Sequence, residues 1–314
     1  MKRKNRHFLR IGDLTKGELS SVLNMSAKLK RELKRKGKNK EHLRNKTLIA
    51  IYEKPSLRTR ISFDIGMTQL GGHSIYLAPS DIKMGERESP KDVGIVSSSM
   101  ADVVMARTFE HETVEKLAEG SSVPVINGLS DLEHPCQVLA DFLTIKEIIG
   151  GVKGLKIAFV GDGNNNVTHS LCMMSSIFGN EFRCAAPKGY EMNKKVVKEV
   201  DEISKSTGAA IVQTTNPGKA VEGADVVVTD TWVSMGSEKD KKKRLKAFLH
   251  YQVTKKLMKR ANKKAIFMHC LPAYRGKEVS GEVIDGSKSV VYQEAENRLH
   301  AQKGLICFLL GVKV

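Results

Sequence analysis

Hydroxyl and guanidinium groups crowd one short stretch of the 314-residue chain, Ser56-Leu57-Arg58-Thr59-Arg60. The stretch follows an apolar run, Thr47–Tyr52, that is typical of a buried parallel strand, and it opens a segment, Ile61–Leu70, that is typical of a helix. Backbone N–H groups at a helix start, the positive end of the helix dipole and two arginines together favour an anion such as phosphate. The alternative interpretation leaves Ser56 as a helix N-cap and the arginines as solvated side chains.

Polar residues also follow the other apolar runs that we predict as strands, and ligands bind at the carboxyl ends of such strands. In the first half of the chain, Arg107 and the segment His134-Pro135-Cys136-Gln137 extend the cationic and amide-rich set. In the second half, Asp162–Asn166, Asp230–Gly236 and His269–Pro272 supply Asn, Asp, Ser and Cys. The first set suits an anion that carries a carbonyl, and the second suits an amino acid. Two such half-sites facing each other across a cleft predict a transferase.

Helical and strand patterns alternate from end to end, which predicts an α/β fold of two doubly wound parallel-sheet domains with the active site in the cleft between them. The glycine-rich segment Gly150–Gly154 is the expected linker. We therefore expect domains at 1–149 and 150–292 and a C-terminal helix at 293–314. Further helices are expected at Leu14–Leu33 and Gln137–Ile149. The predicted strands are Thr47–Tyr52, Ser74–Leu77, Val103–Ala106, Val123–Asn127, Lys156–Val160, Phe182–Ala185, Ala210–Gln213, Asp225–Thr229, Ala265–Met268 and a short one near Val290–Tyr292.

A formal net charge of +17 is a usual footprint of nucleic-acid binding. Much of the charge lies in two runs, Lys28–Lys46 and Lys239–Lys246, of which we expect the second to lie in a loop. No aromatic residue interleaves either run, and no zinc-finger, RNP or basic-zipper pattern is present. A surface that attracts small anions or keeps the protein soluble is the favoured interpretation, and polyanion binding stays as the second function class.

The motifs give little support to other classes of protein function. Gly161 and Gly163 resemble the start of a dinucleotide-binding turn, but Asn166 stands where the third glycine belongs, so no nicotinamide cofactor is expected. Cys270 has no patterned partner for a nucleophilic role and can equally be a small buried hydrophobe, as His134 can be a core histidine. The five cysteines are scattered without metal-ligand spacing, which predicts reduced thiols in a cytoplasm and no metal site. We expect no membrane span and no cleaved targeting segment.

Taken together, five motifs resemble the signatures of the ornithine carbamoyltransferase family, in the family's order and over nearly the whole chain. They are Ser56–Arg60, Arg107 in Ala-Arg-Thr, His134–Gln137, Asp230 with Ser234-Met235-Gly236, and His269-Cys270-Leu271-Pro272. The resemblance implies transfer of a carbamoyl group from carbamoyl phosphate to the δ-amine of ornithine, without a cofactor. It also implies a homotrimer built on the first domain, with active sites at subunit boundaries and the C-terminal helix packed back on that domain.

The resemblance implies a role for individual residues. Arg107, His134, Asp230 and Cys270 are the expected catalytic residues, with Arg107 and His134 at the carbonyl oxygen and either Asp230 or Cys270 favouring the neutral amine. The expected ornithine-binding residues are Asn166, Asp230, Ser234 and Met235. The expected carbamoyl phosphate-binding residues are Ser56, Leu57, Arg58, Thr59, Lys83, Arg107, His134, Gln137, Cys270, Leu271 and Arg298.

Two positions depart from the family pattern. Leu57 stands where the family often has threonine, so a backbone contact survives there and a hydroxyl contact does not. Lys83 stands where relatives lend a Gln or His to the neighbouring subunit, and a lysine can bind phosphate there as a point charge or remain solvated. Acceptors such as putrescine, N-acetylornithine and aspartate are the nearest rivals to ornithine. Arginine biosynthesis is the expected direction, with the reverse reaction left open.

Overall fold

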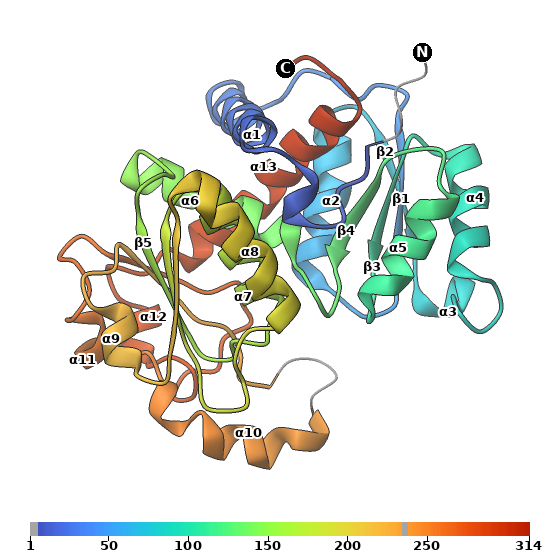
Figure 1. Ribbon diagram of the computed structural model, residues 1–314. Coiled ribbons are helices and arrows are strands. Elements are labelled where there is room, and N and C mark those ends of the chain that lie inside the picture. The colour runs from blue at the N-terminus through green and yellow to red at the C-terminus, as the bar shows by residue number, and fades with distance from the viewer. Residues whose placement is uncertain (1–5, 234–237) are drawn as a thin grey trace. The chain divides into compact units, whose positions relative to one another are not determined.

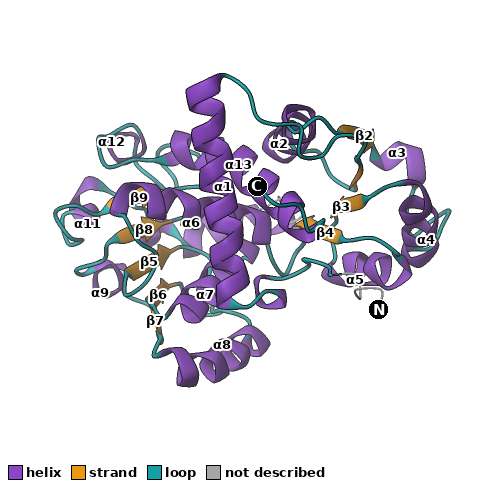
Figure 2. Ribbon diagram, turned by 90° about the horizontal axis from the view of Figure 1, so that it is seen from above, coloured by secondary structure: helices purple, strands orange, loops and turns teal. Residues whose placement is uncertain are grey.

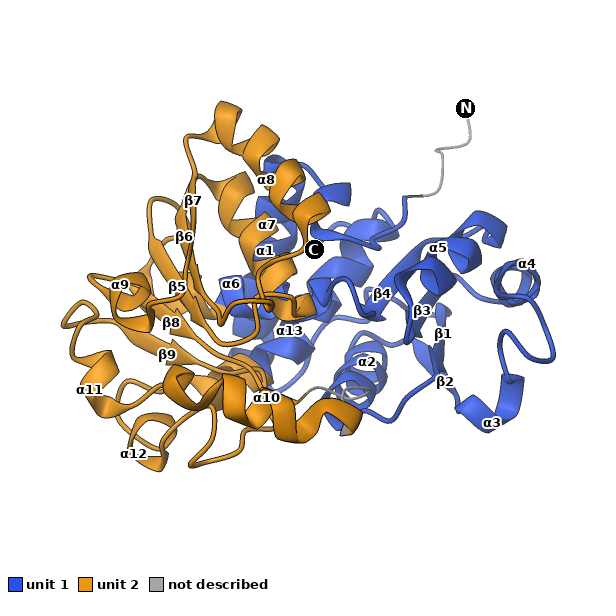
Figure 3. Cartoon of the chain, turned by 60° about the horizontal axis from the view of Figure 1, so that its bottom comes forward, with its two compact units in different colours: residues 1–143, 296–314 blue, residues 144–295 orange. Residues whose placement is uncertain are grey.

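The computed structural model describes residues 6–233 and 238–314. The chain divides into two compact units, unit 1 formed by residues 1–143 and 296–314 and unit 2 formed by residues 144–295 (Figure 3). The division falls between residues 143 and 144 and between 295 and 296, and the glycine-rich segment 150–154 lies inside unit 2. Two helices, α6 (Pro135–Ile149) and α13 (Val291–Leu309), run through these positions, so each unit contains part of both.

The sheet of unit 1 is parallel throughout, in the order β2-β1-β3-β4 (Figure 1). Its strands are β1 (Thr47–Tyr52), β2 (His73–Leu77), β3 (Val103–Arg107) and β4 (Val125–Leu129). The chain adds β2 on one side of β1 and β3 on the other, so the order reverses between β1 and β3. Ligands bind outside the carboxyl ends of the strands at such a reversal.

Helices cover both faces of this sheet. Side chains of α4 (Pro90–Met100) and α5 (His111–Gly120) form a buried cluster with one face of β1, β3 and β4. The buried side chains Phe63 and Met67 belong to α2 (Leu57–Gln69), which contacts β1 and β2. The unit also contains η1 (Ile11–Asp13), α1 (Lys16–Lys36) and α3 (Pro79–Ile82).

Unit 2 has a parallel five-stranded sheet in the order β7-β6-β5-β8-β9 (Figure 2). Here the order reverses between β5 and β8, because β6 and β7 extend the sheet on one side and β8 and β9 on the other. No helix among the described residues is long and apolar enough to cross a membrane. The elements are β5 (Lys156–Val160), α7 (Asn166–Phe178), β6 (Glu181–Ala185), α8 (Lys194–Thr207), β7 (Ala210–Thr214), α9 (Pro217–Val221), β8 (Val226–Val228), η2 (Glu238–Asp240), α10 (Lys241–Ala247), η3 (Leu249–Tyr251), α11 (Lys255–Met258), β9 (Ile266–Met268) and α12 (Gly281–Ile284).

The predicted two-sheet α/β class is confirmed, and two local predictions were wrong. The expected strand at Val290–Tyr292 is absent, because the chain makes only an isolated bridge at Ser289 and enters α13 at Val291. The lysine run 239–246, expected in a loop, is largely helical in α10. Lysine is a good helix former, and Arg244 in this helix is ion-paired with Asp162 at 2.6 Å.

A buried lysine joins three segments of unit 1. Lys303 on α13 is completely buried, and its ammonium donates to Asn39 Oδ1 and to Gln69 Oε1, both at 2.8 Å. Asn39 in turn donates to the Leu29 carbonyl of α1 at 2.9 Å. These hydrogen bonds fix the C-terminal helix to α1, to the loop after it and to α2. Burial lowers the pKa of Lys303 to about 8.

This burial predicts a pH-dependent stability. Between about pH 8 and the ordinary lysine pKa of 10.5, Lys303 is neutral in the folded protein and charged in the unfolded chain. The unfolded state then binds more protons, so the free energy of unfolding should rise with pH across this window. Chemical denaturation should show this rise in the wild type relative to Lys303→Met. The control Lys36→Met, at an exposed position of α1, should keep the rise; parallel curves for the wild type and Lys303→Met would contradict the prediction.

Candidate functional site

The order reversal in unit 1 brings together two segments that the sequence singled out. β1 ends at Tyr52 and β3 at Arg107, and these two residues are register partners. The segment after β1 leads through Ser56 into α2, and His134 precedes α6 after β4. The sheet therefore places the Ser56 to Arg60 segment and Arg107 at one edge, where backbone N–H groups of the first turn of α2 are available to an anion.

Positive side chains surround a buried histidine at this edge. His134 and Arg107 are each only 5% exposed, and Arg298 is 2% exposed. Burial, followed by the charges of Arg298, Arg107, Arg58 and Lys54, holds the pKa of His134 well below its usual range. The imidazole is therefore neutral at physiological pH, and a neutral ring has one N–H to donate. We call these five residues the cation cluster.

Arg298 on α13 connects the first turns of two helices. Its guanidinium donates through Nη1 to Gln137 Oε1 at 2.7 Å and through Nη2 to Thr59 Oγ1 at 3.1 Å. Gln137 also donates to Asp141 Oδ1 at 2.9 Å, so its amide is held from both ends. The structure thus brings together Thr59, Gln137 and Arg298, which lie far apart in the sequence.

The remaining predicted anion-binding residues of unit 1 lie at the start of α2 or in a loop. Ser56 is the N-cap of α2, and its Oγ accepts from the Thr59 N–H at 3.3 Å. The Leu57 side chain is 69% exposed, which leaves only its backbone for an anion. Lys83 is exposed at the end of α3 in a left-handed conformation, with φ at 49°.

Sequence reasoning missed Lys54, which belongs to the cation cluster. Its ammonium lies 4.8 Å from the centroid of the Phe109 ring, and the residue is 7% exposed. Burial, with a smaller contribution from the charge of Arg107, lowers the pKa of Lys54 to about 8. The available signal was a lysine two residues after the end of a predicted strand, where ligands bind in such sheets.

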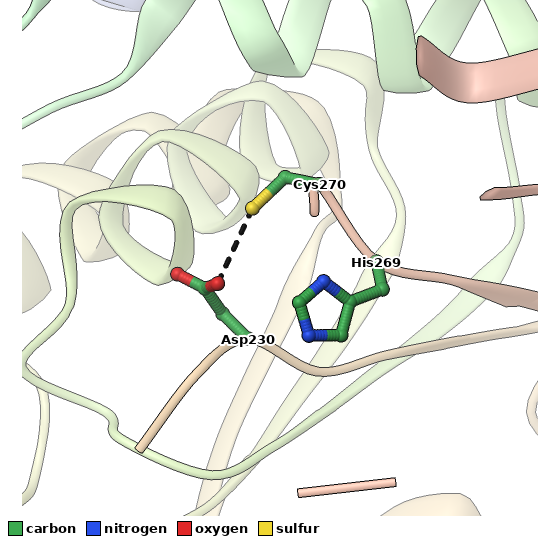
Figure 4. Close-up of side chains that lie close together, drawn as sticks. All are labelled: Asp230, His269 and Cys270. Carbon is green, nitrogen blue, oxygen red and sulfur yellow. Dashed lines mark hydrogen bonds between the residues drawn. The ribbon is translucent and has the colours of Figure 1, made fainter. Parts of the chain in front are cut away.

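The order reversal in unit 2 places acidic, amide and thiol groups together. Asp230 follows β8 and is largely buried, and its carboxylate accepts from the Thr231 N–H at 2.7 Å. The Cys270 thiol, after β9, donates to Asp230 Oδ1 at 3.2 Å (Figure 4). Asn165, after β5, donates to Asp230 Oδ2 at 3.0 Å. A carboxylate held in this way can accept from an ammonium group, or from an amine that loses a proton.

Asp230, His269 and Cys270 each offer a ligand atom within 4.8 Å of the others, an arrangement that raises the question of a metal ion (Figure 4). His269 Nδ1 accepts from the Leu271 N–H at 2.9 Å, so the ring proton is on Nε2, which contacts Glu278 Oε1 at 3.3 Å. Both ring nitrogens are therefore engaged within the fold. His269 orients the backbone of Leu271, and we expect the side chains of Asp230 and Cys270 to be the ones that contact a polar ligand.

The other residues predicted for this half of the chain have mixed placements. Asn166 is the first residue of α7, and its neighbour Asn165, the N-cap of this helix, contacts Asp230. Leu271 has a left-handed φ of 56°, which is uncommon for a branched side chain. Ser234 and Met235 lie outside the described residues. Arg244 of α10 donates to Asp162 Oδ2 and, at 3.1 Å, to the Trp232 carbonyl, so it fixes this helix beside the end of β5.

In a comparison with known proteins, both halves of the chain match domains of one protein family. Residues 6–147 match the carbamoyl-P binding domain of aspartate/ornithine carbamoyltransferase, and residues 153–309 match the Asp/Orn binding domain. The ornithine carbamoyltransferase of Anoxybacillus flavithermus is 47% identical over 98% of this chain and 97% of its own. That of Caldicellulosiruptor saccharolyticus is 49% identical over 97% and 98%.

Two solved structures are similar over almost their full length. The ornithine carbamoyltransferase from Pyrococcus furiosus has a TM-score of 0.93 and 44% identity, covering 98% of this chain and 97% of that one. The anabolic ornithine carbamoyltransferase from Campylobacter jejuni has a TM-score of 0.91 and 41% identity, covering 97% and 98%.

The burial of the thiols predicts selective alkylation. Cys270 is partly exposed, whereas the other four cysteines are buried. Burial raises the pKa of Cys136 and of Cys307 to about 12, and it also raises the pKa of Cys172 and Cys184 well above the ordinary thiol value. Iodoacetamide at neutral pH, followed by peptide mass spectrometry, should label Cys270 first, because the thiolate is the nucleophile. Labelling of Cys136 or Cys307 at the same rate in the folded protein would contradict this prediction.

Proposed function

The chain belongs to the aspartate/ornithine carbamoyltransferase family, and from this premise we propose that it carbamoylates ornithine. The carbamoyl group of carbamoyl phosphate passes to the δ-amine of L-ornithine, giving L-citrulline and phosphate. The observation that carries the proposal is the cation cluster around His134 at the order reversal of unit 1. Relatives that are 47–49% identical over almost the whole chain bear the name ornithine carbamoyltransferase.

The phosphate of carbamoyl phosphate binds at the start of α2. The N–H groups of its first turn and the helix dipole favour the dianion, and Arg58 supplies a positive charge. Arg298 keeps Thr59 and Gln137 in place for this ligand through its hydrogen bonds to both. A bound dianion also stabilises the cation cluster, because it interacts favourably with several positive charges that lie close together.

The carbonyl oxygen gains negative charge when the amine attacks the carbon. Arg107 and the neutral N–H of His134 donate to this oxygen, and donors that are already in position stabilise the charge without reorganisation. The low pKa of His134 keeps its ring a donor of one proton rather than a second source of full charge. No covalent intermediate is needed, because phosphate is the leaving group.

Ornithine binds to the polar group of unit 2. Asp230 carries the acceptor oxygens, and Asn165 and the Cys270 thiol hold its carboxylate in position. Asn166, Ser234 and Met235 stay proposed ornithine contacts, and Leu271 stays a proposed carbamoyl phosphate contact, on the strength of the family resemblance. The δ-ammonium must lose a proton to become the attacking amine, and Asp230 is our choice of acceptor because its carboxylate already accepts from the Cys270 thiol. The thiol keeps its proton, and its S–H turns away from Asp230 Oδ1 when the ammonium approaches.

Assembly as a homotrimer through unit 1 is part of the proposal. Two helices of this unit expose apolar side chains along one face each, which is a usual sign of a protein interface. Lys83 would reach the phosphate site of the neighbouring subunit. We further propose a cytoplasmic enzyme of arginine biosynthesis, which the free thiols and the relative described as anabolic support. The exposed side chains are Leu57, Ile61 and Ile65 on α2 and Ile95, Val96 and Met100 on α4.

Product analysis with parallel acceptors tests the reaction. Purified protein with carbamoyl phosphate should form citrulline from ornithine and should leave putrescine, N-acetylornithine and aspartate almost unreacted. Carbamoylation of one of the other three acceptors instead would overturn the assignment of the amino-acid half. No product with any of the four would overturn the proposed activity.

Arg107 is the residue whose loss should cost the most turnover. Arg107→Ala should lower kcat by roughly 10²-fold or more, because one positioned donor to the developing oxyanion is lost. Citrulline formation at saturating substrates measures this, with a thermal melt to check folding. Arg183→Ala, which removes an arginine that pairs with Glu181 on unit 2, is the matched control and should keep near-normal kcat. Near-normal kcat in Arg107→Ala would remove Arg107 from the mechanism.

Lys54 should make anion binding depend on pH. Its pKa of about 8 means that the ammonium is charged below this pH and neutral above it. The Kd of inorganic phosphate should therefore rise between pH 8 and 9.5, where phosphate itself stays a dianion. Titration calorimetry should show this rise in the wild type, a flat and weaker profile in Lys54→Gln, and a flat profile in Lys54→Arg. The same pH dependence in Lys54→Gln as in the wild type would show that another group titrates.

A further inference from the structure

A second cationic site lies on unit 1, along α1. A groove of about 400 Å³ is bounded by the outer face of this helix and by the loop that follows it. The groove is separate from the cation cluster, because none of its lining residues belongs to that cluster. Its lining residues are Lys28, Arg31, Glu32, Arg35, Lys36, Lys40, His42 and Val314.

The charge of the groove is strongly unbalanced. Glu32 is the one carboxylate side chain among the described lining residues, and it already accepts from Asn39 Nδ2 at 3.1 Å and from the Lys40 N–H at 3.4 Å. Within the described chain, Arg31, Arg35 and Lys40 form no ion pair, although Lys34 on the same helix is paired with Glu296 at 2.6 Å. Lys36 is paired with Glu32 at 3.4 Å, so the groove holds more positive side chains than its described acidic side chain can balance.

Stabilisation of the helix dipole does not account for this pattern. Cations in the last turn of a helix interact favourably with its negative end, which explains Arg35 and Lys36. Lys28 and Arg31 precede the last turn, and Lys40 and His42 follow the helix. The helix dipole therefore does not explain why Lys40 and His42 also line the groove, whereas a function of the whole groove does.

The loop that returns these residues is held in place. Gly37 ends α1 in a left-handed conformation with φ at 70°, and this turns the chain back. Asn39 then donates to the Leu29 carbonyl and accepts from the buried Lys303. Lys28 is also positioned, since its ammonium donates to the Val314 carbonyl at 2.7 Å. The cations thus line a concave surface on a fixed backbone.

We propose that this groove is a binding site for an oligophosphate chain, such as inorganic triphosphate or the triphosphate of a nucleotide. The lining residues of α1 run from Lys28 to Lys36, a length of about 12 Å along the helix axis. Two or three linked phosphates place several negative charges within such a length, and arginine binds phosphate with paired N–H groups. The binding site is independent of the carbamoyl-transfer reaction and gives a use to the first lysine-rich run.

A small phosphate chain fits better than a nucleic acid. Single-stranded nucleic acids bind through aromatic side chains on which their bases stack, together with positive charge along the strand. None of the described residues that line the groove is Phe, Tyr or Trp, and the groove is short. The groove therefore suits a ligand with closely spaced negative charges better than a ligand with bases that must stack.

Calorimetric titration of inorganic triphosphate tests the proposal. The wild type should bind it saturably, and the charge reversal Arg31→Glu with Arg35→Glu should weaken the binding by at least about tenfold. The matched control is Lys194→Glu with Lys198→Glu, two exposed lysines on α8 that give the same change in net charge. This control should bind within about twofold of the wild type. The milder pair Arg31→Gln with Lys40→Gln keeps the test possible if the charge reversal destabilises α1. This pair should also weaken triphosphate binding, by a smaller factor than the charge reversal.

Two further arms separate this groove from the active site and identify the source of the phosphates. Arg107→Ala should keep triphosphate binding, and the charge reversal at Arg31 and Arg35 should keep citrulline formation. Equal affinity for triphosphate and ATP would assign the phosphate chain alone, and tighter binding of ATP would assign a nucleotide. No saturable binding, equal losses in both charge-reversed variants, loss only in Arg107→Ala, or tighter binding of an RNA oligomer would overturn the proposal.

Discussion

Buried positive charge around His134 is the constraint on which the rest of the site depends. Arg107 and Arg298 are almost completely buried. Burial of His134 itself, together with these two charges and those of Arg58 and Lys54, lowers the pKa of His134 and keeps the ring neutral. Such a cluster is stable only because the protein pairs some of its donors internally, as Arg298 does with Thr59 and Gln137. We propose that this concentration of positive charge attracts a dianion, and that Arg107 and His134 then donate to the oxygen that becomes negative during the reaction.

Sheet topology explains why these side chains meet. In each unit the strand order reverses beside the first strand, between β1 and β3 and between β5 and β8. The residues at or just after the ends of those strands are Lys54 to Arg58 and Arg107 in unit 1, and Asp162 to Asn166 and Asp230 in unit 2. The cationic group and the acidic group thus occupy the equivalent position in two sheets of the same type. We propose that each unit provides, within its own fold, the residues that bind one of the two substrates.

Local patterns in the sequence predicted most of the fold, and tertiary contacts decided the rest. The strands β1 and β5 have the predicted ends, because apolar runs bounded by polar residues mark buried parallel strands clearly. The run near Val290 has the same local pattern, yet its backbone turns into α13. In the site, motif order indicated Arg107 and His134. No local pattern predicts that Arg298 bonds to Thr59 and Gln137, that Asn165 contacts Asp230, or that Lys54 is buried.

Thermal unfolding with and without carbamoyl phosphate tests the central claim, that the ligand-free cation cluster is built to take up a dianion. If the claim holds, carbamoyl phosphate alone, without ornithine, should raise the melting temperature, since a ligand at 100 times its Kd stabilises the folded state by about 2.7 kcal/mol. The increase should persist in the variant with Arg31 and Arg35 changed to glutamate and should be lost in Arg107→Ala. An unchanged melting temperature in the wild type, or an increase that survives the loss of Arg107, would contradict the account.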